Sequence, residues 1–200
     1  MRRVVVLAVL AMALPIAAWA DGIDITNKGG SIAASISGIV STKSHLTSFN
    51  GITAPPGHAL GYLNFSTGAF SGTSLFSSGT FSSTGSKFVM VGQGNYGEPK
   101  GTIFSGSFIG PIDWTVMSHV QGKPWTFELK GQIEGMLWNG RTVTGNTQQT
   151  IYSSTSQFSQ GIGHIRVGTT STVPEPGTLG LLGTGLVGIA GIFRRKLMKS

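Results

Sequence analysis

The sequence has no cysteine and few charged residues, although it runs to 200 residues. Without cysteine there is no disulfide, iron–sulfur cluster or thiol nucleophile, so burial alone must hold the folded part together. Charged residues make up 10% of the chain, against about a quarter in an average globular domain. Helices that present a charged face to solvent are therefore not expected, and the folded part should consist of strands.

Positive charge is concentrated at the two ends of the chain. The formal net charge is +7, but Arg2 and Arg3 lie near the N-terminus, and residues 174–200 hold four cations against one glutamate. Residues 21–173 keep only +2, from eight cations and six anions. They contain no basic patch with interleaved aromatic residues, so we expect no nucleic-acid partner.

The first twenty residues have the pattern of a secretory signal peptide. Two arginines precede an apolar run from Val4 to Leu14, and Ala18 and Ala20 supply the small residues of an Ala-x-Ala cleavage site. We therefore expect the general secretion machinery to export the chain. Cleavage after residues 1–20 would leave Asp21 as the first residue of the mature protein.

Residues 21–167 predict an all-β domain, an antiparallel sandwich or barrel of short strands rich in Gly, Ser and Thr. Alternation is clearest after Pro124, where one face is apolar: Trp125, Phe127, Leu129, Ile133 and Leu137. Asn139-Gly140 then predicts a type I′ turn, so residues 112–152 should form a three-stranded meander. Asn50-Gly51 signals another hairpin. The pattern fits a sandwich and a barrel equally well.

Residue patterns for catalysis and for metal or cofactor binding are weak. The four histidines are scattered and show none of the short spacings that zinc sites use. Asp113 could lie across a hairpin from Gln132 or Glu134, which would give an extracellular hydrolase a carboxylate pair. With six acidic residues in 21–173, chance proximity explains such a pair better. We expect no cofactor, no metal and no enzymatic activity, with the hydrolase as the weaker alternative.

Two aromatic residues are candidates for contact with sugars. Trp138 directly precedes the Asn139-Gly140 turn on the polar face of its strand, and Tyr96 belongs to a glycine-rich loop. Flat rings beside Asn, Gln and Thr would suit stacking on sugar rings, whereas a Trp at this position can also simply cover the end of the sheet. Trp138 and Tyr96 therefore support, as an alternative function, a carbohydrate-binding module.

The C-terminus has three parts in succession. Residues 168–176 form a linker that ends in Val173-Pro174-Glu175-Pro176, where the prolines enforce a stiff, extended start. The uncharged run 177–193 predicts a single transmembrane helix about 25 Å long, near the lower limit for crossing a bilayer. A basic tail, residues 194–200, opens with Arg194, Arg195 and Lys196 and should stay cytoplasmic.

This arrangement resembles the PEP-CTERM sorting signal, which exosortases recognise in Gram-negative bacteria. The resemblance covers only the C-terminal segment: Val173 to Pro176, Leu179, Gly185-Leu186 and Arg194-Arg195. It implies an exported protein that is held transiently in the inner membrane and cut near Pro-Glu-Pro. The product would reach the outer surface or the extracellular, biofilm-forming matrix of an organism that makes exopolysaccharide. We expect a non-catalytic structural or adhesive β-domain, or alternatively a carbohydrate-binding module for that exopolysaccharide.

Overall fold

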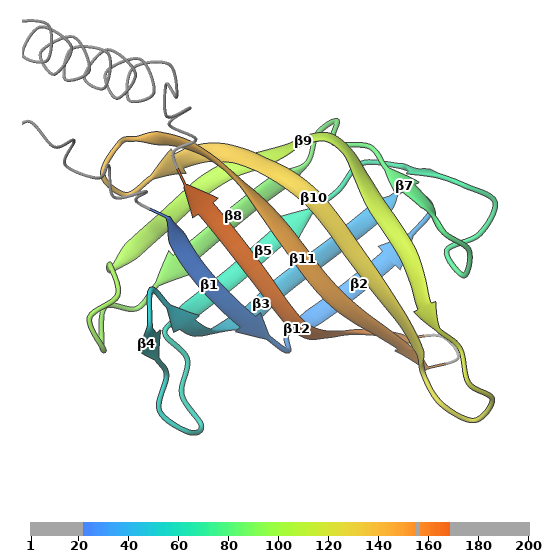
Figure 1. The fold of residues 1–200 in the computed structure, drawn as a ribbon, viewed down its shortest axis with the longest axis horizontal. Helices are drawn as coiled ribbons and strands as arrows, with labels where there is room; N and C mark the ends of the chain where they lie inside the picture. Colours follow the sequence, from blue (N-terminus) through green and yellow to red (C-terminus); the bar gives the residue numbers. More distant parts are fainter. Residues whose placement is uncertain (1–21, 155–156, 169–200) are drawn as a thin grey trace, which may run out of the picture. The chain divides into compact units, whose positions relative to one another are not determined.

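The computed structural model describes residues 22–154 and 157–168, and its regular elements there are all strands (Figure 1). Every pairing between them is antiparallel, which confirms the predicted all-β class. The strands are β1 (Ile23–Lys28), β2 (Ser31–Ser35), β3 (Gly38–Phe49), β4 (Ile52–Thr53), β5 (Gly61–Ser66), β6 (Phe70–Ser71), β7 (Gly79–Phe81), β8 (Lys87–Gly92), β9 (Gly101–Ser118), β10 (Trp125–Leu137), β11 (Thr142–Ser154) and β12 (Gln157–Gly168).

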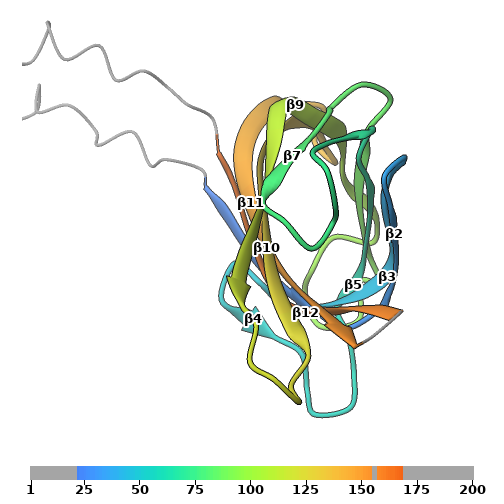
Figure 2. The same cartoon turned by 90° about the vertical axis from the view of Figure 1, so that its right-hand side faces the viewer.

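The sheet closes on itself into a barrel, and this decides between the two predicted architectures. The pairing order runs β10-β11-β12-β1-β3-β5-β8-β9, and β9 pairs with β10 again. Figure 2 shows this ring of strands from one end. The short strands lie beside the ring: β2 pairs with β12 and β3, β4 pairs with β3, and β6 and β7 continue the sheet from β9.

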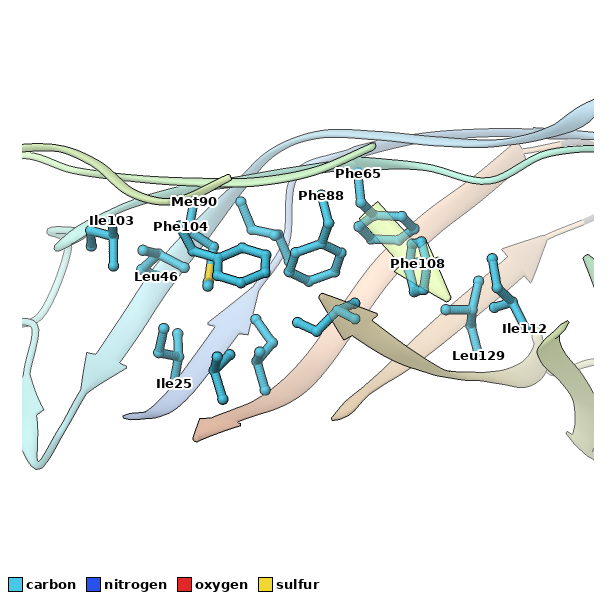
Figure 3. Packing of buried hydrophobic residues seen from close by; sticks show 14 of the residues in the cluster. Ile25, Leu46, Phe65, Phe88, Met90, Ile103, Phe104, Phe108, Ile112 and Leu129 are labelled. Atoms are coloured by element: carbon cyan, nitrogen blue, oxygen red, sulfur yellow. The ribbon is translucent and has the colours of Figure 1, made fainter. Parts of the chain in front are cut away.

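Phenylalanine rings and aliphatic side chains together fill the barrel interior (Figure 3). Phe88 packs edge-to-face on Phe108 with centroids 5.4 Å apart, and Phe65 stacks on Phe88 at 5.9 Å. Glycines in the wall make room for these rings: a Cβ on Gly131 would lie 2.7 Å from the Phe108 ring. Gly131 thus fits the general rule that the interior of a small barrel is filled by side chains of alternating size.

The predicted meander over residues 112–152 is present as β9, β10 and β11. Phe127, Leu129 and Ile133 are fully buried, as their alternation indicates, whereas Lys130 and Gln132 are exposed. β12 ends at Gly168, one residue beyond the predicted domain boundary. Alternation therefore predicted the buried face of β10 correctly.

The prediction of a type I′ turn at Asn139-Gly140 is wrong. Only Gly140 has positive φ there, at 79°. The turn contains three residues, because the Leu137 N–H donates to the Arg141 carbonyl at 2.9 Å. The Trp138 N–H donates to the Ile103 carbonyl at 3.0 Å, which ties the turn to β9. A type I′ geometry does form at Asn50-Gly51, where φ is 47° and 82°.

A network of buried polar side chains crosses the barrel interior beside the aromatic core. Asn27 Nδ2 donates to Ser44 Oγ at 2.8 Å and to Gln149 Oε1 at 2.9 Å. Gln149 Nε2 donates to Asn27 Oδ1 at 3.2 Å and to Thr147 Oγ1 at 2.8 Å. Gln160 Nε2 donates to Gln149 Oε1 at 2.7 Å, and Gln160 Oε1 accepts a hydrogen bond from Ser41 Oγ. The network links β1, β3, β11 and β12 and satisfies its own hydrogen-bonding groups.

Candidate functional site

Trp138 and Tyr96, the two predicted glycan contacts, lie at the end of the barrel where β9 begins and β10 ends. They are 46% and 38% exposed, but each contacts another ring. Trp138 packs edge-to-face on Phe49 at 6.0 Å, and Tyr96 packs on His58 at 6.1 Å. Within residues 22–154 and 157–168, no ring contact joins the two, so they do not form one flat surface. Their contact with glycans stays a prediction.

The β8–β9 connection that carries Tyr96 is organised by the buried carboxylate of Glu98. The Asn95 N–H donates to Glu98 Oε1 at 2.9 Å, and the Tyr96 N–H donates to Oε2 at 3.0 Å. Burial acts to raise the pKa of Glu98, but backbone hydrogen bonds outweigh it, and the pKa lies below its ordinary value. Glu98 is therefore ionised at neutral pH and fixes this loop.

Asp113 and Glu134, the two carboxylates considered for a hydrolase, do not face each other. The partner of Asp113 on β10 is Lys130, and Asp113 lines the same outer groove as Gln132 rather than lying opposite Glu134. A bulge at residues 110–112 of β9 shifts the register there. Lys130 and Glu134 are four residues apart on β10, which is about 13 Å at ~3.3 Å per residue. That separation exceeds what a glycosidase pair requires.

A polar groove of about 840 Å³ lies on the outer face of β9 to β12 and β1. Its acidic and basic groups balance in number, and several are paired: Asp24 lies 3.6 Å from Arg166, while Lys130 lies 2.7 Å from Glu128. The groove-lining Gln148 also donates to Glu128. Much of the hydrogen-bonding capacity of this face is used within it, as expected of a solvated outer wall.

A second hollow, of about 700 Å³, lies at the other end of the barrel, where β10 begins. We call it the aromatic mouth and define it by Phe76, His119, Lys123, Trp125 and Ser153. Phe76 comes from the β6–β7 connection, which crosses the barrel opening in Figure 2. His119 and Lys123 come from the β9–β10 connection, and the other two residues come from the facing strands β10 and β11.

Rings form the walls of the aromatic mouth. His119 stacks on Trp125 with centroids 3.7 Å apart and an interplanar angle of 13°. Phe76 stands at 67° to Trp125, 5.3 Å away, and also contacts Phe127 and Phe158 deeper in the barrel. Phe76 itself is 39% exposed. The mouth is therefore a shallow aromatic site with a closed floor.

Ser153 is the one polar group in this mouth that is buried. It is 1% exposed, and its Oγ is the buried side-chain atom of the described residues that lacks a hydrogen-bond partner. It pairs across the sheet with Trp125 on β10 and with Phe158 on β12, so apolar rings flank it on both sides. An unpaired hydroxyl in such surroundings costs free energy, and a ligand hydroxyl would relieve that cost.

Sequence reasoning did not single out the aromatic mouth as a site. Trp125 was expected only as part of the core face, and Phe76 and Ser153 lie in Ser-rich segments without a motif. The nearest signal is the Gly122-Lys123-Pro124 turn directly before Trp125. Only the folded barrel brings the residues of the aromatic mouth together, because they come from two connections and two strands.

Several sequence predictions fall outside the described residues. These are the signal peptide with Ala18, Ala20 and Asp21, the sorting motif from Val173 to Pro176, the helix 177–193 and the basic residues of the tail. In the part of the chain that the structure describes, no group of three or more His, Asp or Glu side chains is placed to hold a metal ion. The same part has no helix with the length and hydropathy of a membrane span.

Comparison with protein families matches residues 172–196 to the PEP-CTERM protein-sorting motif. This confirms the resemblance carried by Val173 to Pro176 and the following basic cluster. It supports export, a membrane-anchored sorting signal of Gram-negative bacteria and recognition by an exosortase. Comparisons with curated proteins and with solved structures give no match.

Proposed function

We propose that this chain is an exported protein that an exosortase cleaves near Pro-Glu-Pro, and that its barrel then serves at the outer surface or in the extracellular matrix. In this role the barrel is a non-catalytic structural or adhesive module. The observation that carries the proposal is the sorting motif at residues 172–196, which follows the last barrel strand after three residues.

The build of the barrel supports a role without catalysis. Its interior is filled by apolar side chains and by a polar network whose groups bind one another. The carboxylates Asp113 and Glu134 lie in different rows of the sheet. Polar neighbours such as Glu128 and Lys130 are engaged with each other.

Replacement of Pro174, Glu175 and Pro176 by alanine tests the sorting step. We expect the wild-type chain to lose Arg194 to Ser200 by intact-mass measurement and to leave the inner-membrane fraction, and the variant to keep its tail and stay there. Glu134→Gln is the matched control, because it removes an exposed carboxylate of the barrel and should be processed normally. Unchanged processing of the triple variant contradicts the proposal.

Carbohydrate binding is the second candidate function. The observation that favours it is the presence of partly exposed aromatic rings at both ends of the barrel, Trp138 and Tyr96 at one end and Phe76 at the other. Retention of the chain on polysaccharide-coated beads would separate a binding module from a purely structural domain.

A further inference from the structure

We propose that the aromatic mouth binds a sugar ring with an acidic substituent, such as a uronate residue of a polysaccharide. The inference gives the adhesive role a ligand class and therefore rests on the function proposed above. It places the site at the end of the barrel opposite Trp138 and Tyr96.

The arrangement of the rings fits a pyranose. A pyranose ring has flat C–H faces that pack on aromatic rings, and hydroxyls around its rim that need polar partners. The stacked pair His119 and Trp125 supplies one wall of the mouth. Phe76 contacts Trp125 edge-to-face at 5.3 Å and 67°, so a sugar ring would take the place of Phe76 against Trp125 when Phe76 swings aside. Binding pockets commonly combine such apolar walls with a few polar groups that fix orientation.

Ser153 supplies the polar group inside these walls. Its Oγ has no hydrogen-bond partner among the described residues, although the side chain is 1% exposed and lines the hollow. Phe76 lies in the β6–β7 connection and is 39% exposed, so the proposal requires its side chain to swing outward and give a ligand access to this hydroxyl. A sugar hydroxyl would then form the hydrogen bond with Ser153 Oγ that no described residue of the protein makes.

The floor of the mouth limits how deep a ligand can enter. Trp114 and Phe127 are fully buried beneath it, stacked with centroids 4.6 Å apart. Phe158 packs against Phe127 at 6.0 Å and closes the remaining side. A long acyl chain therefore has no tunnel to occupy, whereas a flat ring needs only the shallow space that is present.

Charge at the rim selects an acidic sugar over a basic one. Lys123 and His119 line the hollow, and none of its lining residues is Asp or Glu. By contrast, the outer groove on β9 to β12 carries both Asp113 and Lys130 and pairs its charges internally. A carboxylate on the ligand would meet Lys123, so the affinity should fall as ionic strength rises.

The test compares an acidic and a neutral polymer. The purified full chain, kept in a mild non-ionic detergent because of its apolar C-terminal run, is applied to immobilised polygalacturonate and to immobilised dextran. We expect retention on polygalacturonate, weakened by salt, and little retention on dextran. Retention on dextran alone, or on neither polymer, overturns the inference.

Ser153→Ala separates binding from folding. The change removes an unpaired buried hydroxyl, so the unfolding midpoint of the variant should equal or exceed that of the wild type. The dissociation constant for oligogalacturonate should increase roughly fivefold, because the complex loses one hydrogen bond. Ser159→Ala is the matched control, since Ser159 is an exposed serine of β12. An unchanged dissociation constant in Ser153→Ala contradicts the assignment.

Two more changes locate the site. Phe76→Ala and Lys123→Gln should each weaken binding, because both residues are exposed and neither is part of the core. Trp138→Ala should leave binding unchanged, and loss of binding in Trp138→Ala alone would move the site to the opposite end. Processing at Pro-Glu-Pro is measured separately, so a failure of binding leaves the sorting proposal standing.

Discussion

Gln149→Leu should strongly destabilise the barrel, because Gln149 is the centre of the buried polar network. The side chain is fully buried and takes part in four hydrogen bonds, with Asn27, Thr147 and Gln160. Leucine has a similar size but neither donates nor accepts. The change therefore leaves the packing volume almost constant and isolates the polar contribution.

The magnitude follows from the atoms that lose their partners. Asn27 Nδ2 keeps Ser44, but Asn27 Oδ1 and Gln160 Nε2 have only Gln149 as a partner. Each buried polar atom without a partner costs about 1–3 kcal/mol, so the two together cost about 2–6 kcal/mol. The apolar surface of leucine offsets part of this, and we expect a net loss of about 2–4 kcal/mol. Total stabilities are about 5–15 kcal/mol, so the effect is large.

Urea unfolding of residues 21–170, followed by tryptophan fluorescence, measures this loss, since Trp114 is fully buried and reports on the core. Gln148→Leu is the control: the neighbouring side chain points outward, so its change should stay within about 0.5 kcal/mol. Gly163→Ala adds a second test, because its Cβ would overlap Gln149 Oε1. Equal effects of Gln149→Leu and Gln148→Leu would refute the reasoning.

Further predictions concern the wall and the loops. Gly131→Ala should lower the free energy of unfolding by about 1–3 kcal/mol through overpacking, because the new Cβ would lie 2.7 Å from Phe108. Adding Phe108→Leu to this variant should recover part of the lost stability, and no recovery would contradict the contact. The pKa of Glu98 is lower in the folded state than its ordinary value of 4.5. The ionised carboxylate of Glu98 therefore contributes its full stabilisation of the fold above pH 4.5, and this contribution is lost as the pH falls through the lower pKa of the folded state. The free energy of unfolding should therefore fall more steeply with decreasing pH in the wild type than in Glu98→Gln. Parallel curves would argue against a stabilising role of the ionised Glu98 carboxylate.

Local patterns predicted the strands well where one face is buried and the other is solvated. The alternation from Trp125 to Leu137 fixed which side chains point inward, because a period of two leaves no other choice. Asn50-Gly51 fixed a turn, since both residues tolerate positive φ. Asn139-Gly140 failed although its sequence is equally favourable, because Trp138 bonds to Ile103 on another strand.

Closure of the barrel and assembly of the aromatic mouth were beyond local reasoning. Closure depends on β9, which pairs with β10 on both sides of its bulge at residues 110–112, while its other edge pairs with β8 before the bulge and with β7 after it. The same bulge moved Asp113 opposite Lys130, which no alternation pattern could reveal. Phe76 and Ser153 meet at the mouth from distant positions in the sequence, and neither carries a motif.

Closure of the sheet also bears on how the domain behaves when many copies crowd together. An open sheet with so few charges would expose main-chain N–H and C=O groups along its outermost strands, and these groups would template pairing between copies. In the closed ring, each of the eight strands has a hydrogen-bonded neighbour on both sides. The Ser- and Thr-rich wall therefore does not need charge repulsion to prevent strand pairing between copies. Barrels displayed at high density would stay separate and would not assemble into a fibril.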